Sequence, residues 1–200
     1  MSNLKPPILA FVDLETTHLD PNKGEIVEIG IIRIHDNKIL DIVEHKVKPE
    51  HLETAHPRAL EVNGYNEQDW SCAISQLDCA HLVEKLLKDT VIIGHNISFD
   101  LKFLRALMIQ HDIRFDLWKA PNICTRDLAK NVFKTNPNVN RFRLDDLRVH
   151  FGWSLENAHT ALKDTVDCCK LFYKCISTPC PLDNIERTNR QCWNDGITYT

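Results

Sequence analysis

The stretch Phe11-Val12-Asp13-Leu14-Glu15-Thr16-Thr17 ends an apolar run, Ile8-Leu9-Ala10, with two carboxylates. The pattern predicts a buried strand over residues 8–14. Side chains i and i+2 of a strand point to the same face, so Asp13 and Glu15 project together. Two like charges there repel each other and are costly to desolvate unless a divalent cation binds their oxygens. The pair therefore predicts half of a metal site. The alternative is an ordinary strand that becomes solvent-exposed at its end.

The composition is typical of a single soluble globular domain. The chain has 200 residues, of which 43% are hydrophobic and 26% are charged, and this length suits one domain with a tail. No apolar run is long enough to span a bilayer, and residues 1–7 lack the basic start and apolar core of a signal peptide. We therefore expect a cytoplasmic protein with no membrane partner. Its eight cysteines are therefore expected to be reduced thiols rather than a disulfide framework. C-x2-C pairs typical of zinc sites are absent, so we expect no zinc site.

Charge is unevenly distributed along the chain. The net charge is −4, yet residues 101–150 carry ten Lys and Arg against five Asp and Glu. Local positive charge beside concentrated carboxylates suits a site that holds a polyanion and performs metal chemistry on it. The alternative is a set of solvated helix faces. The basic residues of this segment include Lys102, Arg105, Arg114, Arg126, Lys130, Lys134, Arg141, Arg143 and Arg148.

Hydrophobic periodicity predicts strands first and helices later. The predicted strands are 8–14, 25–34, 39–47, 91–93 and 123–124. The predicted helices are 56–64, 74–87, 98–110 with Ser98 as its cap, 126–133, 144–151 and 158–176. The first three strands have short connections, which favours an antiparallel meander. The whole order indicates an α/β or α+β domain with a mixed sheet over residues 1–176, followed by a C-terminal tail or packed extension, 177–200.

Three further residues are candidates for chemistry. Asp100 is predicted in the first turn of a helix, where the helix dipole stabilises a carboxylate, although acids are common there for that reason alone. His159 and Asp164 would differ in direction by about 140° if both were helical, which is too wide for a metal-binding i,i+4 pair. We expect Asp164 on the helix, holding metal, and His159 in the preceding loop, able to accept a proton. The alternative is a histidine without a catalytic role.

Taken together, three motifs resemble the DEDDh 3′–5′ exonucleases, which include the proofreading exonucleases of bacterial replicative DNA polymerases, their phage relatives and RNase T. The motifs are Asp13-x-Glu15-Thr16-Thr17, Gly94-His95-Asn96-Ile97-Ser98-Phe99-Asp100 and Asn157-Ala158-His159-x4-Asp164. Supporting matches are Ile123-Cys124-Thr125 and Leu144-Asp145-Asp146-Leu147. The resemblance covers about residues 6–176. It implies an RNase H-like α/β fold with a mixed five-stranded sheet flanked by helices.

The resemblance also implies roles. Asp13, Glu15, Asp100 and Asp164 would hold two Mg²⁺ or Mn²⁺ ions, and His159 would be the general base. The implied activity is hydrolysis at the 3′ ends of single-stranded or frayed nucleic acid, with DNA favoured over RNA and release of nucleoside 5′-monophosphates. Contacts to the 2′-OH separate RNA from DNA, and none is identifiable, so the choice stays open. A polymerase or other replication partner is expected. The alternative function is a non-catalytic nucleic-acid- or polymerase-binding module.

Substrate contacts follow from the same resemblance. It assigns the substrate-binding positions to Thr16, Thr17, Leu19, His95, Asn96 and Phe99. For Leu19 and Phe99 the alternative is core packing, and for His95 and Asn96 it is a local turn and helix cap. The family usually has Gly where His18 stands, and His is tolerated less well if that turn needs a positive φ.

Overall fold

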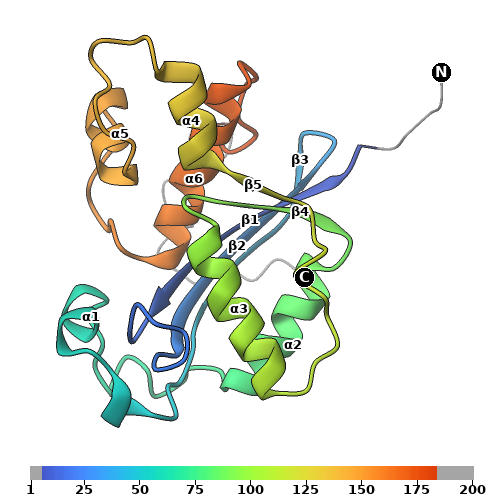
Figure 1. Ribbon diagram of the computed structural model, residues 1–200, viewed down its shortest axis with the longest axis vertical. Helices are drawn as coiled ribbons and strands as arrows, with labels where there is room; N and C mark the ends of the chain where they lie inside the picture. The colour runs from blue at the N-terminus through green and yellow to red at the C-terminus, as the bar shows by residue number, and fades with distance from the viewer. Residues whose placement is uncertain (1–5, 184–200) are drawn as a thin grey trace.

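A mixed five-stranded sheet forms the centre of the fold in the computed structural model, which describes residues 6–183 (Figure 1). Its order is β3-β2-β1-β4-β5. β1 pairs antiparallel with β2 and parallel with β4, β2 pairs antiparallel with β3, and β4 pairs parallel with β5. The predicted sheet and its antiparallel meander are confirmed. The strands are β1 (Ile8–Thr16), β2 (Ile26–His35), β3 (Lys38–Lys46), β4 (Thr90–Gly94) and β5 (Asn122–Cys124).

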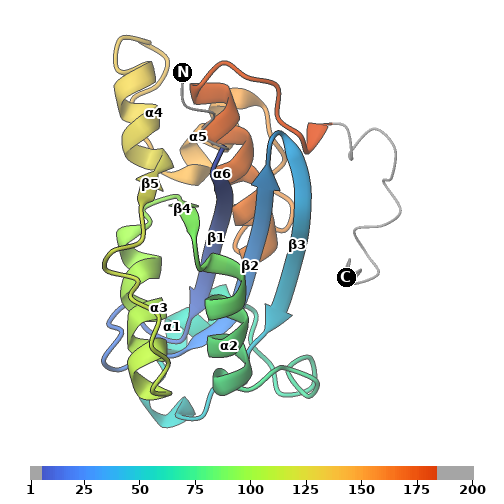
Figure 2. The same ribbon diagram turned by 90° about the vertical axis from the view of Figure 1, so that its right-hand side faces the viewer.

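Helices cover both faces of the sheet. Figures 1 and 2 show α2 and α3 on one side, and α4, α5 and α6 on the other. Among the described residues, no helix is long and apolar enough to cross a membrane. The helices are the 3₁₀ helix η1 (Leu52–Thr54), α1 (Pro57–Val62), α2 (Gln76–Leu87), α3 (Ser98–Gln110), α4 (Thr125–Phe133), α5 (Leu144–Phe151) and α6 (Ala161–Cys175).

Alternation along β1 decides which face receives the two carboxylates. Ala10 and Val12 belong to the core cluster under α2 and α3. Phe11 points to the other face, where its ring centroid lies 5.5 Å from that of Phe172 on α6. Asp13 and Glu15 share the parity of Phe11, so they face α6.

Gly30 allows α6 to approach this face closely. It lies opposite Asp13 in the β1–β2 register. A Cβ added at Gly30 would lie 2.5 Å from the carbonyl oxygen of Ala161, the first residue of α6. The Thr165 hydroxyl lies 3.1 Å from the Gly30 carbonyl and 2.7 Å from that of Ala161, which fastens the first turn of α6 to β2. The missing side chain therefore brings the start of α6 next to Asp13.

The cap of α3 and the start of α6 differ from the sequence prediction, and α2 begins at Gln76 rather than at 74. Ser98 is not a cap, because α3 already includes it and Ile97 stands at the N-cap position without a side-chain hydrogen bond. The chain turns one residue earlier, at Asn96, whose φ is 71°. The last helix begins at Ala161 rather than 158, because Asn157 and His159 have φ values of 57° and 69°, outside the helical region.

The described part of the predicted tail packs on the α6 side of the sheet. Cys180 and Leu182 are buried in the cluster that contains Phe11 and Phe172. Residues 184–200, including Cys192, lie outside the described residues.

Candidate active site

Four acids from three elements gather near the end of β1. Asp13 and Glu15 come from β1, Asp100 from the first turn of α3, and Asp164 from the first turn of α6. Ligand atoms of Glu15, His159 and Asp164 all lie within 4.8 Å of one another. Asp100 is only 3% exposed. The fold therefore brings together acids that lie far apart in the sequence.

Mutual repulsion and burial perturb these acids strongly. Burial raises the pKa of Asp13 well above its usual range, and the carboxylates of Asp100 and Asp164 raise it further. Burial, followed by the Asp164 and Glu28 carboxylates, raises the pKa of Glu15 to about 8. Burial also raises the pKa of Asp100 to about 8, although the Leu14 backbone N–H donates to it. The cluster therefore needs added positive charge to ionise fully near neutral pH.

This donor set fits hard divalent cations. Its oxygens are carboxylates, which Mg²⁺ and Mn²⁺ prefer, and no thiolate takes part. The raised pKa values also indicate a cation site, because a bound cation would stabilise the ionised form of each acid. The residues are therefore suited to a magnesium or manganese centre.

Glu28 holds the start of α6 from the neighbouring strand. It lies opposite Glu15 in the β1–β2 register and is buried. Its carboxylate accepts a hydrogen bond from the Ala161 backbone N–H. Burial and the adjacent Glu44 carboxylate raise the pKa of Glu28 to about 7. Sequence reasoning did not single out Glu28, because a lone Glu within a β-branched strand carries no distinctive spacing.

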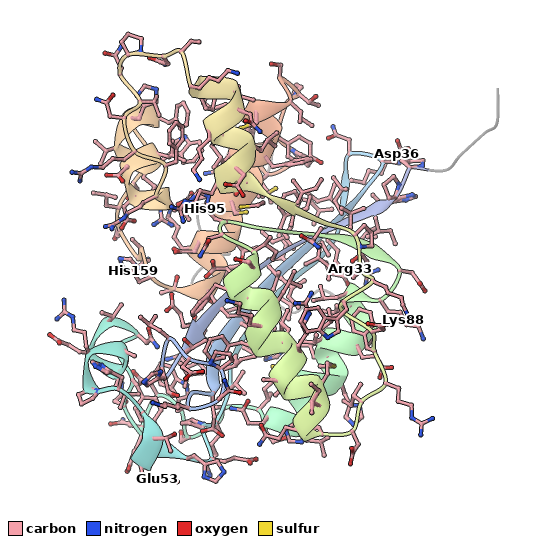
Figure 3. All side chains as sticks on the ribbon, viewed as in Figure 1. Arg33, Asp36, Glu53, Lys88, His95 and His159 are labelled. Carbon is pink, nitrogen blue, oxygen red and sulfur yellow. The ribbon has the colours of Figure 1, made fainter. Side chains whose placement is uncertain are left out.

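His159 lies in the loop before α6, as expected (Figure 3). Its backbone N–H donates to Asp164 Oδ1 at 3.2 Å. Its Nε2 lies 3.7 Å from Asp145 Oδ2, and the side chain is 50% exposed. An imidazole that faces solvent and has a carboxylate beside it can accept a proton and pass it to water.

Arg148 of α5 is the main residue that sequence reasoning missed. The basic segment that contains it predicts a polyanion contact or a solvated helix face, and both are wrong for Arg148 because its side chain is completely buried. Its guanidinium contacts Asp164 Oδ1 at 2.6 Å and Asp167 Oδ2 at 2.7 Å. Arg148 therefore supplies positive charge inside the acid cluster.

The Thr-Thr pair shapes the turn after β1. The Thr16 hydroxyl donates to the His18 carbonyl, and the Thr17 hydroxyl accepts from the Glu25 N–H, both at 2.9 Å. Both threonines are buried. Leu19 is 82% exposed, so the core-packing alternative for Leu19 is wrong. The turn thus uses its hydroxyls internally and presents Leu19 to solvent.

His18 fits this turn without backbone strain. It is absent from the positive-φ residues of the described chain, so a glycine is not required at this position. The space comes from Gly24 instead, where an added Cβ would lie 2.6 Å from His18 Cβ. The Asp20 N–H donates to His18 Nδ1 at 2.9 Å. The departure from the family pattern is therefore accommodated locally.

In the second motif, residues 94–100, hydrogen bonds hold His95 in place, whereas Asn96 is exposed to solvent. His95 is engaged through both ring nitrogens, with Nε2 2.9 Å from the Phe142 carbonyl and Nδ1 3.0 Å from Thr125 Oγ1. Burial lowers the pKa of His95 to about 4, so it is neutral at physiological pH. Asn96 is exposed. Phe99 is partly buried, and its ring centroid lies 5.0 Å from that of Phe103.

A family model described as Exonuclease (RNase T) matches residues 10–172. The chain belongs to this exonuclease family. Among relatives of this exonuclease, a PolC-type DNA polymerase III of Thermotoga petrophila is 28% identical over 100% of the chain and 14% of its own length. The DNA polymerase III subunit epsilon of Aquifex aeolicus is 24% identical over 87% of the chain and 83% of its own length. The 3′–5′ exonuclease DinG of Staphylococcus epidermidis is 30% identical over 82% of the chain and 18% of its own length.

Solved structures show the same fold. Escherichia coli exonuclease I in complex with a dA16 oligonucleotide has a TM-score of 0.71 at 20% identity, over 84% of this chain and 41% of that one. The zinc-bound form of an exonuclease I–ssDNA complex has a TM-score of 0.72 at 20% identity, over 90% and 43%. The predicted RNase H-like exonuclease fold is confirmed. The exonuclease domain described here spans about one-seventh of the PolC-type relatives, at 14% and 13% of their length.

Proposed function

We propose that this exonuclease hydrolyses single-stranded or frayed nucleic acid from the 3′ end, depends on two Mg²⁺ or Mn²⁺ ions, and releases nucleoside 5′-monophosphates. The observation that carries the proposal is the approach of Glu15, His159 and Asp164 ligand atoms to within 4.8 Å of one another, beside the partly buried Asp13 and the buried Asp100. A relative named as a 3′–5′ exonuclease and another named as a DNA polymerase III subunit support the polarity and a preference for DNA.

Each member of the cluster has a distinct task in this proposal. Asp13, Glu15, Asp100 and Asp164 hold the cations. When bound, two cations supply the positive charge that activates a water molecule and stabilises the leaving oxygen. His159 takes the proton of the attacking water on its imidazole and releases it to solvent, which its half-exposed side chain allows.

The terminal nucleotide lies against the turn after β1 and the start of α3. Leu19 offers an exposed apolar side chain, and Phe99 a partly buried ring. Thr16 and Thr17 contribute by shaping the turn that carries Leu19, because their hydroxyls bond within that turn. Asn96 is exposed, with its Oδ1 3.5 Å from Arg126 Nη1, and contacts a phosphate or sugar at the surface in this proposal. His95 acts indirectly in this proposal, as a tether of the loop that carries Asn96.

A polymerase or another replication protein is the proposed partner. Two relatives are named as DNA polymerase III proteins, one a long PolC-type chain and one a subunit of nearly this length. Both names refer to a DNA polymerase, and this chain belongs to an exonuclease family, so we propose a proofreading or repair role here.

The test uses oligonucleotides labelled at one end. With Mn²⁺, a 5′-labelled single strand is expected to shorten stepwise into a ladder, and a 3′-labelled one to release its label as a mononucleotide at once. Asp13→Asn and His159→Ala should abolish turnover, whereas Glu67→Gln, at an exposed carboxylate, should not. Intact substrate after long incubation with metal would refute the proposal. Tight binding without turnover, unchanged in these variants, would establish the non-catalytic module instead.

A further inference from the structure

The proposed active site contains a charged network that the exonuclease chemistry does not by itself require. Its centre is Arg148, whose side chain has no exposed surface. Nε donates to Asp167 Oδ2 and Nη1 to Asp145 Oδ1, both at 2.7 Å. Nη2 donates to Asp164 Oδ1 at 2.6 Å. Because arginine keeps its proton inside proteins, this is a fixed positive charge bonded directly to a proposed metal-holding acid.

Asp167 of α6 anchors the Arg148 guanidinium through Nε. It lies on α6 three residues after Asp164 and is fully buried. Its Oδ2 accepts from Arg148 Nε and from Lys163 Nζ. Its Oδ1 is buried and has no hydrogen-bond partner among the described residues. A carboxylate with an unpartnered buried oxygen is costly, so its contribution lies in holding the side chains of Arg148 and Lys163.

Asp145 extends the network to the proposed base. One oxygen accepts from Arg148 Nη1, and the other lies 3.7 Å from His159 Nε2. The His159 backbone N–H donates to the same Asp164 oxygen that Arg148 contacts. Contacts therefore run in a closed ring through four residues, Arg148, Asp145, His159 and Asp164.

We propose that Arg148 is a positioning residue: its planar guanidinium fixes Asp164 for cation binding and, through Asp145, orients His159, while Asp167 anchors it. Asp164 Oδ1 already accepts two hydrogen bonds, so Oδ2 is the oxygen presented to a cation. A lysine would supply the charge without the three fixed donor directions. The inference rests on the proposed metal site and goes beyond it in naming the residue that organises the site.

The test variant is Arg148→Met combined with Asp167→Leu. It removes one positive and one negative charge, so the net charge is unchanged, and neither residue is proposed to hold a cation. Mn²⁺ binding is measured without nucleic acid by electron paramagnetic resonance of the free ion. Residues that orient metal ligands typically change affinity or activity by 10- to 100-fold, so we expect at least roughly tenfold weaker Mn²⁺ binding and a kcat loss of similar size. KM should change less than about threefold, and Arg148→Lys should recover part of both losses.

The matched control removes another ion pair. Arg33 Nη1 lies 3.1 Å from Asp41 Oδ2 between β2 and β3, and both are partly buried. Figure 3 shows Arg33 well to the right of His159, away from the proposed active site. Arg33→Met with Asp41→Leu should leave Mn²⁺ affinity, kcat and KM unchanged. If circular dichroism shows that the Arg148 double variant does not fold, Asp167→Asn replaces it. We then expect smaller losses of Mn²⁺ affinity and kcat.

The outcomes separate the two proposals. Unchanged Mn²⁺ affinity and kcat in the folded variant would overturn the role of Arg148. A wild-type protein that binds Mn²⁺ but does not cleave overturns the exonuclease proposal alone, and weaker Mn²⁺ binding in the variant still supports Arg148. A wild-type protein without Mn²⁺ binding overturns both.

Discussion

Glu15→Gln is predicted to stabilise the metal-free protein at high pH. Burial and neighbouring carboxylates raise the pKa of Glu15 from 4.5 to about 8. Between these values the folded protein keeps a proton that the unfolded chain has released, so stability falls as pH rises through this window. The difference corresponds to about 5 kcal/mol once the pH exceeds both values, and to about 4 kcal/mol at pH 8. Neighbouring acids share this cost, so we expect a gain of about 2–4 kcal/mol for the variant at pH 8.

The assay is urea unfolding in EDTA at about pH 5 and pH 8, comparing wild type, Glu15→Gln and the exposed control Glu67→Gln. At pH 5 the folded wild type already holds the proton, so the gain should fall below about 1 kcal/mol. Mg²⁺ should stabilise the wild type more than Glu15→Gln, because binding to the folded state alone raises stability. The reasoning is refuted if Glu15→Gln is no more stable than wild type at pH 8 in EDTA.

Four further substitutions test other parts of the site. Gly30→Ala places a Cβ 2.5 Å from the Ala161 carbonyl, so it should cost about 1–3 kcal/mol in urea unfolding and lower kcat by up to about 100-fold as α6 shifts. Leu19→Ala should change stability by less than about 0.5 kcal/mol, since the side chain is 82% exposed, yet raise KM for oligonucleotides. Phe99→Ala should raise KM and also lower stability. His95→Ala should cost about 1–3 kcal/mol in urea unfolding. It should leave the pH–rate profile above about pH 6 unchanged, because the pKa of His95 is about 4.

Much of the fold follows from local pattern. The β-branched run of β2 and the turn residues Asp36 and Asn37 predict the meander. In the structure these two residues have φ values of 48° and 59°, as a tight turn between antiparallel strands requires. The helix starts do not follow as well. The last helix begins after His159 because left-handed residues end the loop, and hydrophobic spacing alone carries no information on φ.

The acids of the site were identifiable from motif spacing, whereas its positive charge was not. Arg148 follows Leu144 and Leu147 on the apolar side of α5, and Asp167 lies among the buried residues of α6. A charge on an apolar helix face is a signal for a buried partner. The pairing itself depends on α5 packing beside α6, which the sequence pattern does not specify. Gly30 could not be identified from the sequence either, because its role depends on the close approach of Ala161 in the folded chain.

A count of bound Mn²⁺ tests the two-cation site most directly. Equilibrium dialysis near pH 8, with a single-stranded oligonucleotide whose terminal phosphodiester resists hydrolysis, would give the number of ions per chain. We predict two ions for the wild type and at most one for Asp164→Asn, in a variant that remains folded. Fewer than two retained ions in the wild type, or an unchanged count in Asp164→Asn, would contradict the proposed two-cation centre.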